Sequence, residues 1–427
     1  MPLFKLLKRA AAVFVGGLAK QPDWSHLPFV VLVKVFLYLN NSDKYHAALT
    51  CKSWLSPLSL PSVWQSGDFV FDTSSDHKAI RFVKMTGKTL RHIRAECRAG
   101  DFDFWGKRST ASSTSKVYQF LANLLNSRNN QILTFKLINL YSLEIDGQSR
   151  SFSEVAQLLT KVLEEQQQLR VLDLSNSQKS VENCLNDYLT VKQGMKLLTA
   201  AGKNCANTLK ILMIARLVII IIKDELGLLP QFRSAISGFS KLSYLDISYG
   251  YLNDDLLLSL ATTSSLKVIT IRSEKIPKLE SGTTPSAWEK LTAACPELRT
   301  LFFIKPKYES YFQDATTILT PSMPLYLVQW RAGSVIAIEN IEKFFQYVAQ
   351  NFQQTLHHLE FQTGVRLDMK RFKVLFKSLQ PCTNLDTLSL GLTFDVSDNV
   401  EMYMLAIRAA MRRCLSSCDL TLNVQNE

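Results

Sequence analysis

Histidine, cysteine and carboxylate side chains are the groups through which this chain of 427 residues could transfer protons or hold a metal. The most suggestive set is His357, His358 and Glu360. Alternation along a strand places His358 and Glu360 on one face and His357 on the other, which favours a solvated polar face over an acid–base pair. The paired carboxylates at 164–165 and 254–255 are typical of a helix surface and a helix start.

Sequence motifs for catalysis are missing as well. The chain has no glycine-rich phosphate loop, no G-x-S-x-G elbow and no H-E-x-x-H pair. Its eight cysteines are scattered without a C-x-x-C pair, a pattern typical of reduced thiols inside a cell. The sequence therefore predicts no active site, no metal site, no cofactor and no enzymatic activity, and it favours a cytoplasmic or nuclear location.

The charge and the apolar runs of the chain limit the kinds of partner that it is expected to have. The net charge of +12 permits nucleic acid binding but does not favour it, because Lys and Arg are spread along the sequence. Residues 1–20 combine a basic start with a short apolar run, which is typical either of a targeting segment or of an amphipathic extension. We favour the extension. The run 217–222 predicts a buried strand or loop edge, and neither run predicts a membrane span.

A short apolar pattern recurs along most of the chain. It consists of an apolar residue, two spacers, a second apolar residue, one spacer and a third apolar residue. Ten copies fit, from residues 90–95, the weakest, to residues 385–390, and the seventh copy places Leu298, Leu301 and Phe303 on one side of a strand. Such evenly built triplets predict short strands in a repeat architecture.

Helical patterns precede most of these strands. In residues 153–166 apolar side chains recur at i, i+3, i+4, i+7 and i+8, and Ser153 is predicted to cap the first turn. Residues 341–352 and 372–379 follow the same spacing. The unit of helix, turn and short strand predicts an α/β solenoid in which parallel strands line one face and helices line the outer face.

The pattern resembles leucine-rich repeats, although copies lie 24 to 42 residues apart, which makes this an irregular version. A run of βαβ units in an ordinary α/β domain is the alternative fold. We divide the chain into an extension at 1–22, a separate helical module at 23–70 and the irregular repeat domain at 80–427.

Residues 27–64 do not follow the repeat. Their first predicted helix is apolar nearly all round, with Leu32, Val35, Phe36 and Leu39 on one face and Val30, Val31, Val33 and Leu37 on the others. A second helix, predicted to begin near a capping Ser42 and to run to Trp54, covers one side only. Three of the six tryptophans lie in or beside this stretch. The uncovered side predicts docking to another protein.

The same stretch is similar to the F-box. The resemblance lies in Leu27-Pro28, Asn40 to Asp43, Ala48-Leu49, Cys51-Lys52, Trp54 and Val63-Trp64. It implies binding to the adaptor Skp1, and through Skp1 to a cullin scaffold. The contacts it implies are Leu27, Pro28, Leu32, Val35, Phe36, Leu39, Leu49, Cys51, Trp54 and Trp64. One departure is Val30, which stands where an acidic residue is usual.

The order of an F-box followed by leucine-rich repeats resembles the substrate receptors of SCF ubiquitin ligases. Within them, residues 288–291 and 302–303 are similar to the group of F-box only protein 39 and its relatives. The resemblance implies a non-enzymatic adaptor whose solenoid binds a protein substrate. Polar strand positions are the candidate substrate contacts, namely Arg170, Asp173, Lys210, Asp246 and Arg299.

Two other functions fit parts of the sequence. A plain leucine-rich scaffold that binds protein or RNA, without a role in ubiquitination, would use the first helices only as a cap of the solenoid. A secreted repeat protein would depend on residues 1–20 acting as a signal.

Overall fold

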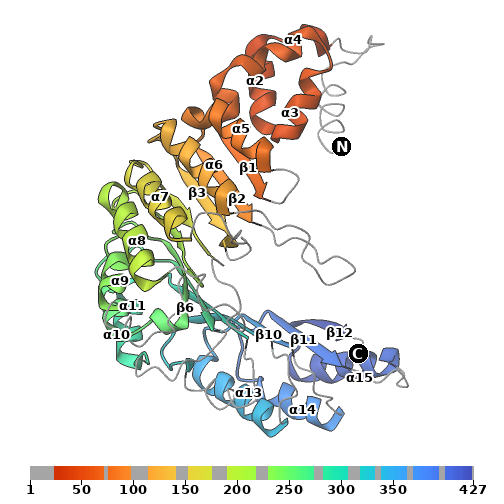
Figure 1. The fold of residues 1–427 in the computed structure, drawn as a ribbon. Coiled ribbons are helices and arrows are strands. Elements are labelled where there is room, and N and C mark those ends of the chain that lie inside the picture. The colour runs from red at the N-terminus through yellow and green to blue at the C-terminus, as the bar shows by residue number, and fades with distance from the viewer. Residues whose placement is uncertain are drawn as a thin grey trace, which may run out of the picture.

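The computed structural model describes residues 24–71, 76–97, 114–140, 152–175, 190–217, 229–273, 282–305, 318–331, 338–362, 369–393 and 400–425. Twelve strands form one parallel sheet whose spatial order follows the sequence (Figure 1). The strands are β1 Ser66–Phe71, β2 His92–Cys97, β3 Thr134–Ile138, β4 Val171–Asp173, β5 Ile211–Met213, β6 Tyr244–Ser248, β7 Val268–Ser273, β8 Arg299–Ile304, β9 Leu325–Arg331, β10 His358–Gln362, β11 Thr387–Thr393 and β12 Asp419–Gln425.

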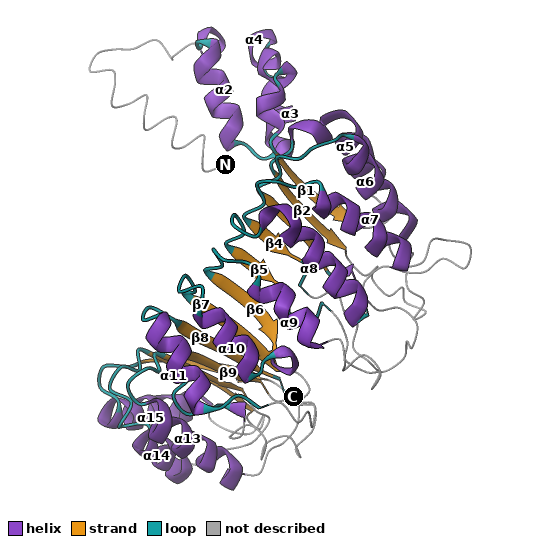
Figure 2. Ribbon diagram, turned by 90° about the vertical axis from the view of Figure 1, so that its left-hand side faces the viewer, coloured by secondary structure: helices purple, strands orange, loops and turns teal. Residues whose placement is uncertain are grey.

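Helices between the strands cover one side of this sheet, and the sheet bends into an arc (Figures 1 and 2). They are α5 Asp76–Thr86, α6 Thr114–Asn126, α7 Phe152–Glu164, α8 Val191–Cys205, α9 Leu229–Ser237, α10 Asp254–Ala261, α11 Pro285–Ala294, α13 Ile338–Phe352, α14 Met369–Ser378 and α15 Val400–Cys414. Strands inside and helices outside confirm the predicted α/β solenoid.

The core lies between the two layers and is built as a ladder. The middle apolar residues of successive triplets pair across the strands, as Ile93 with Phe135, Phe135 with Leu172, and Leu172 with Leu212. All four side chains are fully buried. Burial of each such side chain stabilises the fold by about 1.5–3 kcal/mol, so repetition of the ladder accounts for a continuous core.

The seventh triplet was predicted in the wrong register. In β8 the buried residues are Thr300, Phe302 and Ile304, whereas Leu301 and Phe303 are half-buried on the other side. The pairing of β8 with β9 shifts between Thr300 and Leu301, as at a β-bulge. Because side chains alternate along a strand, a shift of one residue exchanges the two faces.

Two strands, β1 and β12, are not among the ten triplets that the sequence predicted. β1 alternates correctly, with Phe69 and Phe71 buried, but it lies before the first triplet, and its Gly67 pairs with Ile93, so a glycine stands at the position of the middle apolar residue. β12 pairs on one side only, so Leu420 and Leu422 are half-buried. The sheet therefore begins at Ser66, inside the span 23–70 that the sequence assigned to the helical module.

The structure also tests the predicted start of one helix and the predicted burial of one apolar run. The predicted helix at 153–166 is α7, but it begins at Phe152, so Ser153 lies inside its first turn and does not cap it. Leu217 is buried as expected, whereas residues 218–222 and 1–22 lie outside the described residues. No helix in the described parts of the chain is long and apolar enough to cross a membrane.

Candidate functional site

The N-terminal module, residues 24–64, is a small helical cluster beside β1 (Figure 2). It comprises α2 Phe29–Tyr38, α3 Asn41–Ala48, α4 Lys52–Leu55 and three short 3-10 helices, Trp24–His26, Ser56–Ser59 and Pro61–Trp64. Its own core is Phe36, Ala48, Val63 and Trp64, and the half-buried Trp54 ring lies 6.1 Å from the ring of Phe36. This cluster is separate from the core of the sheet.

The second predicted helix is two helices. α3 begins after Asn40, whose side-chain oxygen accepts a hydrogen bond from the amide of Asp43 at 2.8 Å, so Asn40 and not Ser42 is the cap. α3 ends at Ala48, and α4 begins only at Lys52. The prediction of one helix from 42 to 54 was wrong because periodicity does not reveal the extended residue Cys51 between them.

A joint fixes the module to the first repeat. The ring of Trp64 lies 5.5 Å from Phe82 of α5, in an edge-on arrangement. Lys44 is buried, and its ammonium donates to the carbonyl of Val63 at 2.8 Å while lying 5.6 Å from the Trp64 ring. The amide of Asn41 donates to the carbonyl of Ser66 in β1. Apolar packing and polar bonds together hold the module on the sheet.

The surface of the module is rich in exposed apolar side chains. Twelve large apolar side chains are exposed among the described residues, and eight of them lie between residues 29 and 55. We call these eight the apolar face: Phe29, Val30, Val31, Leu37, Tyr38, Tyr45, Leu49 and Leu55. Val30 and Leu37 lie two turns apart on one side of α2, opposite the buried Leu32 and Phe36. This concentration of exposed apolar residues makes the apolar face the candidate docking surface of the chain.

The predicted docking residues divide by exposure. Leu32, Phe36 and Trp64 are buried and hold the module together. The half-buried ones are Leu27, Val35, Leu39, Cys51 and Trp54, and the exposed ones are Pro28 and Leu49. The predicted contacts omitted the exposed Leu37, Tyr38 and Tyr45, although Leu37 had been placed on a different face of the helix from Leu32 and Phe36.

Cys51 is a partly exposed thiol at the edge of the module. Its sulfur lies 3.1 Å from the hydroxyl of Ser53. The hydrogen bond with Ser53 lowers the pKa of the Cys51 thiol, since it stabilises the thiolate.

The sheet face brings two of the predicted substrate contacts into one polar cluster. Asp173 and Asp246 face the same way on β4 and β6, with Met213 between them. Asp246 is fully buried, and both of its carboxylate oxygens accept hydrogen bonds from Arg272. The Nε of Arg272 lies 2.9 Å from Oδ1 and 3.1 Å from Oδ2 of Asp246. Burial raises the pKa of Asp246, and Arg272 opposes that rise. Sequence reasoning missed Arg272.

The other three candidates lie elsewhere. Arg170 and Lys210 are exposed neighbours just before β4 and β5, where the amide of Lys210 donates to the carbonyl of Arg170. Arg299 begins β8, and its guanidinium lies 4.6 Å from the ring of Tyr326, which in turn stacks on His357. The five candidates therefore form no single site.

The histidine pair behaves as surface polar residues. His358 contacts the hydroxyls of Thr387 and Tyr326, and His357 contacts the carboxylate of Asp386 at 2.8 Å. Glu360 shares a face with His358, as expected, but pairs with Arg331. No group of three or more His, Cys, Asp or Glu side chains that could hold a metal occurs among the described residues.

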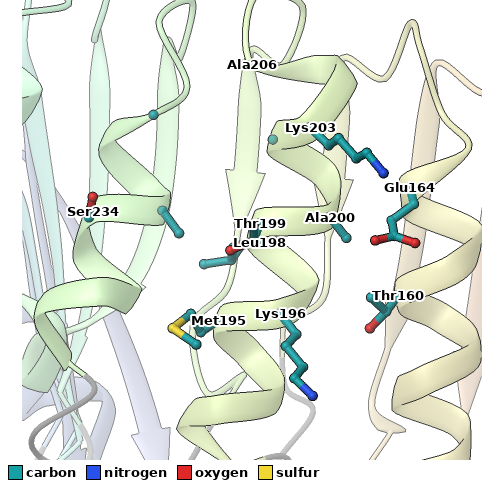
Figure 3. A pocket seen from close by; sticks show the side chains of 13 residues that line it. Thr160, Glu164, Met195, Lys196, Leu198, Thr199, Ala200, Lys203, Ala206 and Ser234 are labelled. Carbon is teal, nitrogen blue, oxygen red and sulfur yellow. The ribbon is translucent and has the colours of Figure 1, made fainter.

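A hollow of about 720 Å³ lies on the helical side, between α7, α8 and α9 (Figure 3). Its lining is mainly apolar, and Met195 and Leu198 point into it from α8. Lys203 extends toward Glu164, the only carboxylate of the lining, which includes no histidine or cysteine. The hollow therefore offers a groove between helices and no acid–base set.

Comparison with known proteins points to the N-terminal module. A family model described as F-box-like matches residues 24–69, which span the module and most of β1. Among solved structures, the chain is similar to the TLR13 chain of a TLR13–ssRNA13 complex, with 14% identity and a TM-score of 0.37. That match covers 88% of this chain and 48% of TLR13, so the chain spans about half the length of TLR13.

Proposed function

We propose that this chain is the substrate-recognition subunit of an SCF-type ubiquitin ligase, in which the N-terminal module binds Skp1 and the solenoid binds a protein substrate. The observation that carries the proposal is the apolar face, because it lies within the residues that match the F-box-like model. F-box domains generally bind Skp1. A finer kinship with F-box only protein 39 and its relatives stays a prediction.

The geometry supports a non-enzymatic, positional mechanism. The contacts of Trp64 with Phe82 and of Asn41 with Ser66 fix the module relative to the repeats. A substrate held on the solenoid would then keep a constant position relative to Skp1 and its cullin scaffold, which raises the effective concentration of substrate lysines near a ubiquitin-conjugating enzyme. We place this activity in the cytoplasm or the nucleus.

The polar strand positions are the proposed substrate contacts. Arg170 and Lys210 are exposed and available for direct contact, whereas Asp246 is buried and would act by holding Arg272 in place. Arg299 with Tyr326 offers a second contact region. The substrate itself would be recognised by such side chains in combination.

The test is binding of the full chain to purified Skp1, measured by isothermal titration calorimetry. The double variant V30D/L37D places two charges on the apolar face and leaves Leu32 and Phe36 intact. We expect it to weaken binding about 100-fold or more, since desolvating unpaired charges in an interface is costly. Replacement of Leu32 or Phe36 would instead unfold the module.

The matched control is M85D, which adds a charge at an exposed apolar residue of α5 outside the module. It should bind Skp1 as the unmodified chain does. Unchanged binding of V30D/L37D would contradict the assignment of this face. Absence of binding by the folded, unmodified chain would contradict the ligase function and favour the plain scaffold.

The scaffold alternative has one observation in its favour. The module covers the side of the first repeat, where Trp64 packs on Phe82, as a cap of the solenoid would. Capping alone does not account for eight exposed apolar residues on its surface. Capping and docking are compatible, and Skp1 binding distinguishes a module that only caps from one that does both.

A further inference from the structure

Two adjacent helices at the C-terminal end of the arc supply half of the net positive charge of the chain. α14 carries four basic and no acidic residues, and α15 carries three basic residues and one acidic residue, Glu401. Together they contribute +6 of the net +12. The helices pack against each other in the fold, although β11 separates them in the sequence (Figure 1).

Six of these seven basic side chains are exposed, and we call them the basic face: Lys370, Lys373, Lys377, Arg408, Arg412 and Arg413. None of the six forms an ion pair with a residue that the structure describes. The seventh, Arg371, is paired with Glu342 of α13 at 2.9 Å. The basic face thus lies beside Glu342 of α13, and its six side chains are exposed among the residues that the structure describes.

Helix electrostatics explain only part of this arrangement. Lys377, Arg412 and Arg413 lie in the last turns of their helices, where cations interact favourably with the helix dipole. Lys370 lies in the first turn of α14, where a cation is unfavourable. Lys373 repels Lys377 one turn away, because like charges at i and i+4 of a helix destabilise each other. An anionic partner would relieve this repulsion.

Apolar side chains lie among these charges. Outside the N-terminal module the described residues include four exposed large apolar side chains, and three of them are on α14 and α15, namely Val374, Met402 and Leu405. Val374 follows Lys373 and precedes Lys377, and Leu405 lies one turn before Arg408. The surface therefore combines exposed aliphatic groups with a strong positive field.

We propose that the paired outer faces of α14 and α15 bind an acidic, amphipathic protein segment, with its carboxylates on the basic face and its apolar side chains on Val374, Met402 and Leu405. Charge complementarity supplies the attraction and steers the encounter. The aliphatic residues supply the apolar contact. This surface lies on the helical side, away from both the module and the strand face, so the proposal does not depend on Skp1 binding.

Two other anionic partners fit less well. A membrane surface is usually contacted through aromatic anchors, whereas the exposed apolar side chains that the structure describes on α14 and α15 are aliphatic. A nucleic acid backbone needs cations but gains little from Val374 and Leu405, and stacking on bases requires aromatic rings. Both are outcomes that the experiment separates.

The experiment measures binding of the full chain to a fluorescent synthetic helix of about five turns, with Glu on one side and Leu on the other. We expect the charge variant K373E/K377E/R412E to weaken binding at least about tenfold. The variant M402S/L405S should weaken it about threefold to tenfold, because apolar area is lost without a change of charge. All these side chains are exposed, and unchanged melting curves would confirm intact folds.

Controls separate this surface from general basicity. K78E/R81E/K84E makes the same change of charge at exposed residues of α5, and M85S makes the matched apolar change there. Neither should alter binding of the synthetic helix. Equal losses in both charge variants, or equally tight binding of a poly-glutamate peptide, would overturn the proposal. So would tighter binding to phosphatidylserine vesicles or to single-stranded RNA that is lost in K373E/K377E/R412E.

Discussion

Lys44 shows how one side chain can fix two elements of the module relative to each other. It lies in α3 and is buried, and its ammonium donates to the carbonyl of Val63 in the 3-10 helix Pro61–Trp64. Burial lowers the pKa of Lys44, because water no longer solvates the cation fully. A buried cation tolerates only the geometry that satisfies it, so Lys44 favours one position of that 3-10 helix against α3.

The cysteines differ in their microenvironments, and their reactivity is expected to follow. Cys51 is partly exposed with a lowered pKa, whereas burial raises the pKa of Cys382 and of Cys418 to about 11. Near pH 8 the buried thiols would be almost fully protonated and inert. We predict that iodoacetamide modifies Cys51 well before Cys382 or Cys418, as measured by peptide mass spectrometry over time.

Saturating Skp1 should slow that modification, because Cys51 lies next to the apolar face. The C51S variant is the control for assignment of the fast signal. Equal rates at the three cysteines would show that these environments do not persist in solution.

At the scale of elements, the joint between the module and α5 joins two cores. Phe82 packs against both the buried cluster of the module and the buried cluster of the sheet, so its ring bridges these two separate clusters. The ring of Trp64 contacts the rings of Phe82 and Tyr45, and the distance between ring centroids is 5.5 Å in both pairs. Loss of this contact should therefore weaken the first repeat as well as the module.

We predict that W64A lowers the free energy of unfolding by about 3–5 kcal/mol, the usual cost of truncating a large buried aromatic side chain. Urea titration followed by circular dichroism measures it. L55A, in the same module but exposed, should cost less than about 0.5 kcal/mol. Similar values for the two variants would mean that the joint contributes no stability.

At the scale of the whole molecule, the two ends of the sheet are unequal. Both β1 and β12 pair with a single strand, yet β1 is covered by the module, through Asn41 and Trp64, and β12 has half-buried apolar residues. In a solenoid each repeat is stabilised by its neighbours, so an uncovered end opens first.

Hydrogen exchange tests this difference. Amides of β12 should exchange faster than those of β1, and both faster than those of β6 and β7, which are paired on two sides. W64A should speed exchange in β1 and leave β12 unchanged. Slower exchange in β12 than in β1 would contradict the view that the module stabilises its end of the sheet.

Sequence by itself determined the repeat, the layers and the helical module. Triplets with buried middle residues such as Leu172 and Leu212 recur because parallel strands under a helical layer bury the same positions in every unit. The sequence likewise indicated a module with too much apolar surface for its size. These are local periodicities, and local spacing is what a single sequence records directly.

Tertiary structure alone decided which residues face outwards and which meet. The burial of Phe302 depends on its pairing with Ile271 of β7 and Val328 of β9, and the pairing of Asp246 with Arg272 depends on the neighbouring strand. Likewise Leu32 is buried and Val30 is exposed. Both residues are apolar, so only the packing of the module decides which of them is buried. The basic face exists only because two distant helices pack side by side, which no local pattern encodes.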